Sequence, residues 1–151
     1  MPVSIDTLAA VAVKVVPPAP KPPPAVIPQT ISLLPPGYND RKISVVRTLF
    51  VNTDSITLNV YDNGIVDGDI VSVVYNDKTI VDKLSLKSKA LVVKIPVGKV
   101  GINKLVFYAH NLGEYPPNTA QLDIYYGNKK EQLTISSDYT VSSAIDIVYQ
   151  P

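Results

Sequence analysis

The chain has 151 residues and a formal net charge of +1, with 14 basic and 13 acidic residues scattered along it. A chain of this length can form one domain that buries roughly two-thirds of its unfolded surface. The even scatter of charge offers no basic stripe, so neither nucleic acid nor an anionic membrane surface is expected as a partner. Cysteine is absent, which excludes disulfides, thiol catalysis and zinc-thiolate sites but leaves the compartment open.

Residues 1–16 contain a short β-branched run from Thr7 to Val16 that is interrupted by Lys14. The run is much shorter than the roughly 20 apolar residues that cross a bilayer, so no direct membrane span is expected. Ten residues cannot bury their apolar side chains against themselves, and exposed sheet edges recruit such segments. We expect this run to pair with an edge of the following domain or to add a strand to a protein partner, with disorder as the alternative.

Residues 17–41 are rich in proline, and nine of the fourteen prolines lie between Pro17 and Pro36. Proline lacks the amide hydrogen and fixes φ near the polyproline II value, so the stretch is expected to be an extended, semi-rigid linker of about 3.1 Å per residue. Recognition by a proline-binding domain is the alternative. The sequence therefore predicts a β-prone segment over 1–16, a linker over 17–41 and a folded domain over 42–151.

From residue 42 onward, short alternating runs of apolar and polar residues are separated by turn-forming residues, and no stretch has a helical period. The run from Ser55 to Val60 places apolar side chains on one face and polar side chains on the other. Asn76-Asp77 and Gly127-Asn128 have the chemistry of tight turns. The expected strands cover residues 43–51, 55–60, 70–75, 79–84, 90–97, 105–110, 120–126, 131–136 and 142–149.

Strands of this number and spacing predict an all-β fold: an immunoglobulin-like antiparallel β-sandwich of eight or nine strands. A closed barrel is the alternative, because both architectures alternate inward and outward side chains. The tryptophan and the cysteine pair typical of immunoglobulin domains are absent. The pattern therefore predicts two packed sheets but not their topology.

The loop from Tyr61 to Asp69 places three carboxylates, an amide and two glycines between two apolar runs. Glycine permits positive φ, so the side-chain oxygens can converge on one point, and calcium takes about six to eight oxygen ligands. The candidate metal ligands are Asp62, Asn63, Asp67 and Asp69, with calcium as the candidate cation. The spacing is not that of an EF-hand and lacks its closing glutamate, so the alternative is a polar turn with side chains bonded to the backbone.

A second irregular loop runs from Asn111 to Thr119 and is long for a hairpin. Its two adjacent prolines stiffen it and allow a cis peptide bond. A stiff loop can bind carbohydrate or peptide with little loss of entropy, although the absence of tryptophan weakens the carbohydrate prediction. The candidate ligand-binding residues in and beside the two loops are Tyr61, Glu114, Tyr115 and Asn118. The alternative is that the loop only caps the sandwich.

The residues predict a protein that is not an enzyme. His110 is the only histidine, so no histidine pair can hold a transition metal, and no Gly-x-Ser-x-Gly elbow accompanies it. Glu114 and Asp67 lie on loops without a groove of aromatic side chains, which makes them a poor pair for glycoside hydrolysis.

Two motifs occur together, Tyr-Asp-Asn-Gly-x-x-Asp-Gly-Asp at residues 61–69 and Asn-Leu-Gly-x-x-Pro-Pro-Asn-Thr-Ala at residues 111–120. Over about residues 42–148 the chain resembles a β-sandwich domain recurrent in exported and cell-surface proteins of Bacteroidetes. His110 stands where glutamate is common in that family. The resemblance implies an extracytoplasmic location (periplasmic, outer surface or secreted), no established enzymatic activity, and two loops that lie together.

These observations predict a non-catalytic interaction or structural module of an exported or surface-associated assembly, held on its proline-rich spacer. The expected partner is a protein, contacted by the strand of residues 7–16. The alternative is a calcium-assisted module that binds carbohydrate or peptide.

Overall fold

The computed structural model describes residues 33–151, which form nine strands and one short 3-10 helix, η2 (Tyr38–Asp40). The strands are β1 (Lys42–Val51), β2 (Ser55–Tyr61), β3 (Ile70–Tyr75), β4 (Lys78–Ser85), β5 (Leu91–Pro96), β6 (Ile102–Ala109), β7 (Asn118–Tyr126), β8 (Lys129–Ser137) and β9 (Val141–Tyr149). All nine predicted strands are present. The run of residues 7–16 and the linker as far as residue 32 lie outside the described residues. No helix within residues 33–151 has the length and apolar content needed to cross a membrane.

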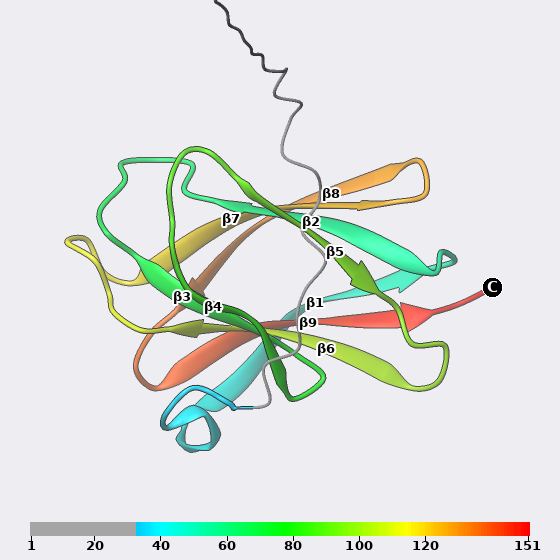
Figure 1. Ribbon diagram of the computed structural model, residues 1–151, viewed down its shortest axis with the longest axis horizontal. Coiled ribbons are helices and arrows are strands. Elements are labelled where there is room, and N and C mark those ends of the chain that lie inside the picture. The colour runs from blue at the N-terminus through cyan, green and yellow to red at the C-terminus, as the bar shows by residue number, and fades with distance from the viewer. Residues whose placement is uncertain (1–32) are drawn as a thin grey trace, which may run out of the picture.

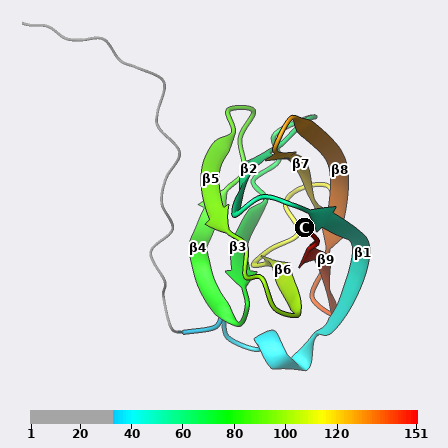
Figure 2. The same cartoon turned by 90° about the vertical axis from the view of Figure 1, so that its right-hand side faces the viewer.

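The strands form two sheets that pack face to face (Figures 1 and 2). One sheet has the order β1-β9-β6-β3-β4 and the other has the order β5-β2-β7-β8. Neighbouring strands are antiparallel except β1 and β9, which are parallel. The predicted β-sandwich is confirmed, and its strands divide into two sheets instead of closing into a barrel.

The core lies between the two sheets and is built from the apolar faces of the alternating strands. In β2, the side chains of Ile56, Leu58 and Val60 are buried, whereas the polar residues between them are partly exposed. Strand β6 contributes Leu105 and Phe107 from the opposite sheet. Burying each such side chain stabilises the fold by roughly 1.5–3 kcal/mol. A register slip of one residue would turn this face to water, so the core fixes the strand pairing.

Residues 33–41, the last part of the predicted linker, pack against the outer face of the five-stranded sheet. Tyr38 is buried against Tyr108, with the ring centroids 6.3 Å apart. The Tyr108 hydroxyl donates a hydrogen bond to the Pro36 carbonyl, and the Arg41 guanidinium lies 3.8 Å from the centre of the Tyr108 ring. Proline content indicated an extended chain, but it could not reveal that the last residues of this segment contact the sheet.

Candidate functional site

Two loops lie against each other at one end of the sandwich: residues 62–69, between β2 and β3, and residues 110–117, between β6 and β7. Backbone amides of the second loop and of β7 bond to aspartates of the first. Glu114 N donates to Asp67 O and Tyr115 N donates to Asp67 Oδ2, each at 3.0 Å. Thr119 N donates to Asp69 Oδ2 at 3.0 Å. The two loops therefore lie together, as the paired motifs implied.

Two asparagine side chains form hydrogen bonds to the backbones of these loops and connect them. Asn111 accepts a hydrogen bond from Ile70 N at 2.9 Å and donates one to Gly68 O at 2.8 Å. The Asn118 amide donates to Ile70 O at 3.1 Å and to Asn111 O at 3.0 Å, and its side chain is buried, with Asn118 only 1% exposed. Asn118 was predicted to contact a ligand, but its amide is committed to the loop backbone.

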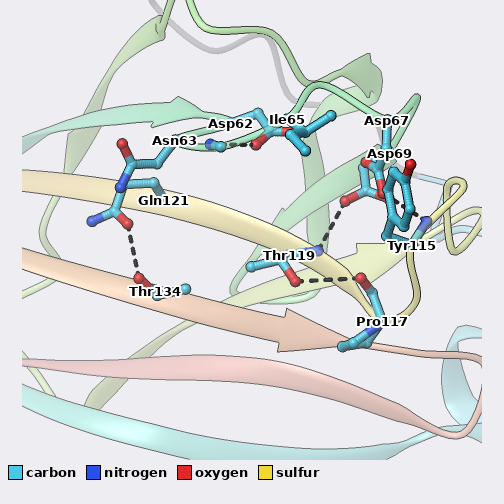
Figure 3. A pocket seen from close by; sticks show the side chains of 11 residues that line it. Asp62, Asn63, Ile65, Asp67, Asp69, Tyr115, Pro117, Thr119, Gln121 and Thr134 are labelled. Carbon is cyan, nitrogen blue, oxygen red and sulfur yellow. Dashed lines mark hydrogen bonds between the residues drawn. The ribbon is translucent and has the colours of Figure 1, made fainter.

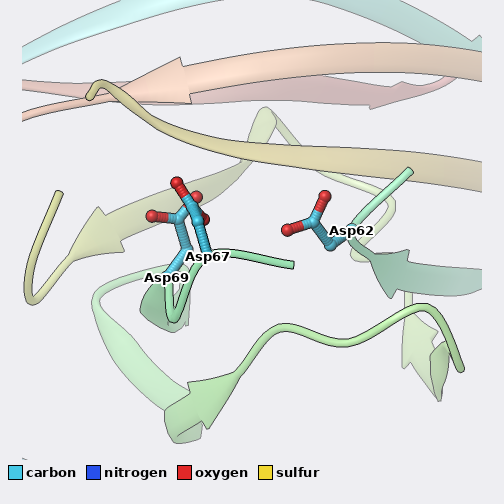
Figure 4. A group of neighbouring side chains, drawn as sticks. All are labelled: Asp62, Asp67 and Asp69. Carbon is cyan, nitrogen blue, oxygen red and sulfur yellow. The ribbon is translucent and has the colours of Figure 1, made fainter. Parts of the chain in front are cut away.

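The carboxylates of Asp62, Asp67 and Asp69 converge between the loops (Figures 3 and 4), where one oxygen from each lies within 4.8 Å of the others. Two unit charges at 4.8 Å repel by about 3 kcal/mol at an effective dielectric constant of about 20. Asp69 is only 2% exposed, and burial raises the pKa of its carboxyl. The Thr119 amide lowers this pKa, whereas the charges of Asp67 and Asp62 raise it further.

One oxygen of each carboxylate is held by a backbone amide. Asp62 Oδ1 accepts a hydrogen bond from Gly64 N at 3.0 Å, which is the side-chain-to-backbone turn expected of this loop. The corresponding oxygens of Asp67 and Asp69 are the two Oδ2 atoms bonded to the second loop and β7. Asp69 Oδ1 is buried and has no hydrogen-bond partner among the described residues. The turn and the cation site are therefore compatible, because the turn uses only one oxygen of Asp62.

Gly113 allows the second loop to approach these carboxylates closely. Its φ is +63°, and a Cβ at this position would lie 2.4 Å from Asp69 Oδ1 and 2.8 Å from Asp67 Oδ2. These distances are shorter than real Cβ contacts, so a larger residue would have to displace the two carboxylates or push the loops apart. The sequence does not predict Gly113 as part of the site, because a glycine in a loop does not reveal what lies against it.

A pocket of about 370 Å³ opens between the two loops and extends over β7 and β8 (Figure 3). Besides the three aspartates, its lining consists of Asn63, Gly64, Ile65, Tyr115, Pro117, Thr119, Gln121 and Thr134. Gln121 and Thr134 face each other across β7 and β8, and the threonine hydroxyl donates to the glutamine at 2.8 Å. The sequence prediction missed these two residues because strand register brings them to the pocket.

Of the four residues predicted to contact a ligand, the pocket lining includes Tyr115, which is 62% exposed. Tyr61 lies in β2, and its hydroxyl donates to Asp123 at 3.2 Å. Glu114 is exposed at the loop beside the pocket. Asn63, a predicted metal ligand, lines the pocket, but Figure 3 shows its side chain on the Gln121 side, away from Asp67 and Asp69.

A serine, a histidine and an aspartate also meet on the outer side of the five-stranded sheet. Ser72 Oγ lies 2.7 Å from His110 Nε2 and donates to Asp82 at 3.2 Å. In a nucleophilic triad the carboxylate bonds to the histidine and the hydroxyl is open to substrate. Here Asp82 bonds to the serine, Ser72 is 0% exposed, and burial lowers the pKa of His110. The arrangement is that of a packed polar network.

Comparisons with known proteins do not assign the chain to a family. A scan against protein-family models and searches of curated proteins and of solved structures found no match. The resemblance to the exported Bacteroidetes domain therefore stays a prediction from the two loop motifs.

Proposed function

We propose that the chain is a non-catalytic interaction module of an exported or surface-associated assembly, and that the pocket between residues 62–69 and 110–117 is its binding surface. The pocket itself carries this proposal, because its walls are tied together by hydrogen bonds between the loops while Tyr115 is exposed at its edge. A wall that is already ordered loses little entropy when a partner binds. Tyrosine also supplies a large contact area that is apolar over the ring and polar at the hydroxyl.

The amino-terminal segments support the remaining parts of this function. A proline-rich chain is stiff and extended, so it can hold the module at a distance from an anchor. The run of residues 7–16 has the composition to add a strand to a protein partner. The resemblance of the two loop motifs supports an extracytoplasmic location.

The absence of cysteine allows a direct test of the binding surface. Tyr115→Cys places a single thiol at the pocket, and Val100→Cys places one at a loop residue that is 93% exposed and outside the pocket lining. Each variant of the full chain is labelled with a thiol-reactive photocrosslinker and irradiated with the cell-envelope fraction of the source organism. We expect a discrete cross-linked product from position 115 and none from position 100. Equal yields from both positions, or no product from position 115, would contradict the assigned surface.

Deletion of residues 7–16 tests the added strand separately. If these residues contact the partner, the deletion lowers the yield of the cross-linked product from position 115 at equal protein concentration. An unchanged yield would rule out strand addition while leaving the pocket as the contact.

A second candidate function, binding of carbohydrate or a peptide, is favoured by the polar surface that continues from the pocket. The pair Gln121 and Thr134 is followed across β7 and β8 by Asp123 and Gln132, which are bonded at 3.0 Å. Planar polar side chains and a tyrosine edge suit the hydroxyl groups of a sugar or the backbone of an extended peptide. Binding to a panel of soluble glycans and peptides that is lost in Gln121→Ala, but kept in Thr57→Ala on the same sheet, would establish this candidate; no binding to the panel would exclude it.

A further inference from the structure

Asp69 is a buried carboxylate whose bonding is incomplete. Its Oδ2 is held by Thr119 N at 3.0 Å, whereas its Oδ1 is buried and has no partner among the described residues. A carboxylate removed from water is strongly destabilised unless a donor or a cation compensates it. Asp69 Oδ1 therefore requires a partner that the described part of the chain does not supply.

The surroundings of Asp69 add negative charge instead of neutralising it. Asp62 and Asp67 bring their oxygens within 4.8 Å of Asp69 and of each other, and Figure 4 shows their carboxylates directed toward the same space. Within residues 33–151, none of the three aspartates forms a salt bridge with lysine, arginine or histidine. Residues 33–151 therefore supply no positive charge at this cluster, and a cation from solution fits the open position.

We propose that Asp62, Asp67 and Asp69 bind one divalent cation of the hard, oxygen-preferring class, with calcium as the fitting member. Each carboxylate has one oxygen oriented by a backbone amide, at Gly64, Tyr115 or Thr119, and the other oxygen without a hydrogen bond in the described chain. Such amide bonds are the outer contacts that orient metal ligands. Calcium accepts six to eight oxygens in irregular geometry, so water and backbone carbonyls can complete its shell, whereas magnesium demands a near-ideal octahedron.

The same cation would strengthen the pocket, because two of its ligands are the aspartates bonded to Tyr115 and Thr119. Ligation of Asp67 and Asp69 fixes the oxygens that hold the second loop, and Gly113 leaves room for both carboxylates at that point. This inference deepens the ligand-binding candidate above and supplies its cation. Its readouts need no partner, so its failure can be told apart from failure of the proposed binding surface.

The competing explanation is a proton shared between Asp67 and Asp69. Three carboxylates within 4.8 Å of one another, one of them buried, favour any positive species at this position, whether proton or metal ion. A shared proton makes stability depend on pH and not on calcium. A bound cation makes stability grow with the logarithm of calcium concentration above the dissociation constant.

The test uses the full chain and two independent readouts. In thermal melts at pH 7, we expect calcium to raise Tm relative to EDTA, and magnesium to raise it less. Terbium is then titrated as a luminescent substitute for calcium, with excitation of Tyr115, whose backbone bonds directly to Asp67. We expect saturable terbium emission that calcium displaces. Tyr115→Phe should reduce the emission without changing the effect of calcium on Tm.

Substitutions at the cluster identify the ligands. Asp69→Asn and Asp67→Asn should each weaken terbium binding at least tenfold and remove the effect of calcium on Tm, and the half-exposed Asp62→Asn should weaken binding without endangering the fold. Asp54→Asn is the matched control, because Asp54 is an exposed aspartate whose salt bridge is with Lys99. Equal Tm values in calcium and EDTA, emission that does not saturate, or an equal loss in the Asp54→Asn control would overturn the assignment.

Discussion

Two buried polar side chains lie near opposite ends of strand β6, and they differ in how completely they are bonded. Asn103, near the start of β6, is 3% exposed, and its oxygen accepts from Asn76 Nδ2 and Gly98 N, both at 3.1 Å. Its nitrogen donates to Gly98 O at 2.8 Å and to Ile147 O at 3.1 Å. Asp69, beside the loop that follows β6, has one oxygen bonded and the other without a partner in the described chain.

The two ends of one sandwich therefore differ in how fully their buried polar groups are bonded. At the Asn103 end, the loops are closed by an uncharged amide whose four bonding positions are all used, which is the arrangement that stabilises a buried polar group. At the Asp69 end, a carboxyl group is buried beside two others, and one of its oxygens has no hydrogen-bond partner within residues 33–151.

The largest expected effect is at Asn103. Asn103→Ala removes the side-chain partners of the Gly98 backbone and of the buried Ile147 carbonyl, so we expect a loss of about 3 kcal/mol in the free energy of unfolding. Urea unfolding measures the loss. Asn63→Ala removes an exposed amide and should change the stability by less than about 0.5 kcal/mol. Similar losses in the two variants would mean that Asn103 does not close its end of the sandwich.

The next largest loss of stability is expected on substitution of Gly113. Gly113→Ala introduces strain at φ +63° and forces a Cβ against Asp69, so we expect a loss of about 2 kcal/mol. Gly101→Ala is the control, because Gly101 has φ +75° but no heavy atom within 4 Å of its Cβ position; its loss should be about 1 kcal/mol. The difference between the two losses in the free energy of unfolding measures the cost of placing a Cβ where the loops approach closely. Equal losses would contradict this close approach.

Removing the charge at Asp69 should raise the free energy of unfolding, whereas the two preceding substitutions lower it. In EDTA at pH 7, Asp69→Asn keeps an oxygen for Thr119 N and replaces a buried charge by an amide that can donate to Asp67. We expect a gain of about 1 kcal/mol in the free energy of unfolding, measured by urea unfolding. A loss of stability would show that the charged carboxylate is already compensated within the chain.

The smallest expected effect is the contribution of Asp69 to the pH dependence of stability. It is measured, in EDTA, as the free energy of unfolding of the wild type minus that of Asp69→Asn. The pKa of Asp69 is raised above 3.8, so the folded state binds its proton more tightly than the unfolded chain does. The difference in stability is therefore highest below that value and falls as pH rises through the raised pKa. His110 and Asp138, whose pKa values are lowered, contribute equally to both proteins and cancel. A flat difference would mean that burial does not perturb Asp69.

Much of the fold could be predicted because it depends on local alternation. The pattern in β2 predicted both the strand and its buried face, and β3 was predicted with its observed bounds. Strand β6 begins at Ile102 instead of Leu105, because Asn103 is polar yet buried and so interrupts the alternation. The parallel pairing of β1 with β9 could not be predicted, since it joins strands at the two ends of the domain.

For the candidate site, the sequence alone determined which residue types are present: three aspartates, an asparagine and a stiff loop ending in two prolines. It could not decide which of them meet. Tertiary structure brought Gly113 against Asp69, committed Asn118 to the backbone, and added Gln121 and Thr134 to the pocket. The physical reason is that spacing along a chain governs only local geometry. Whether Asp69 is buried, and whether both of its oxygens find hydrogen-bond partners, depends on loops that are about 50 residues apart in the sequence.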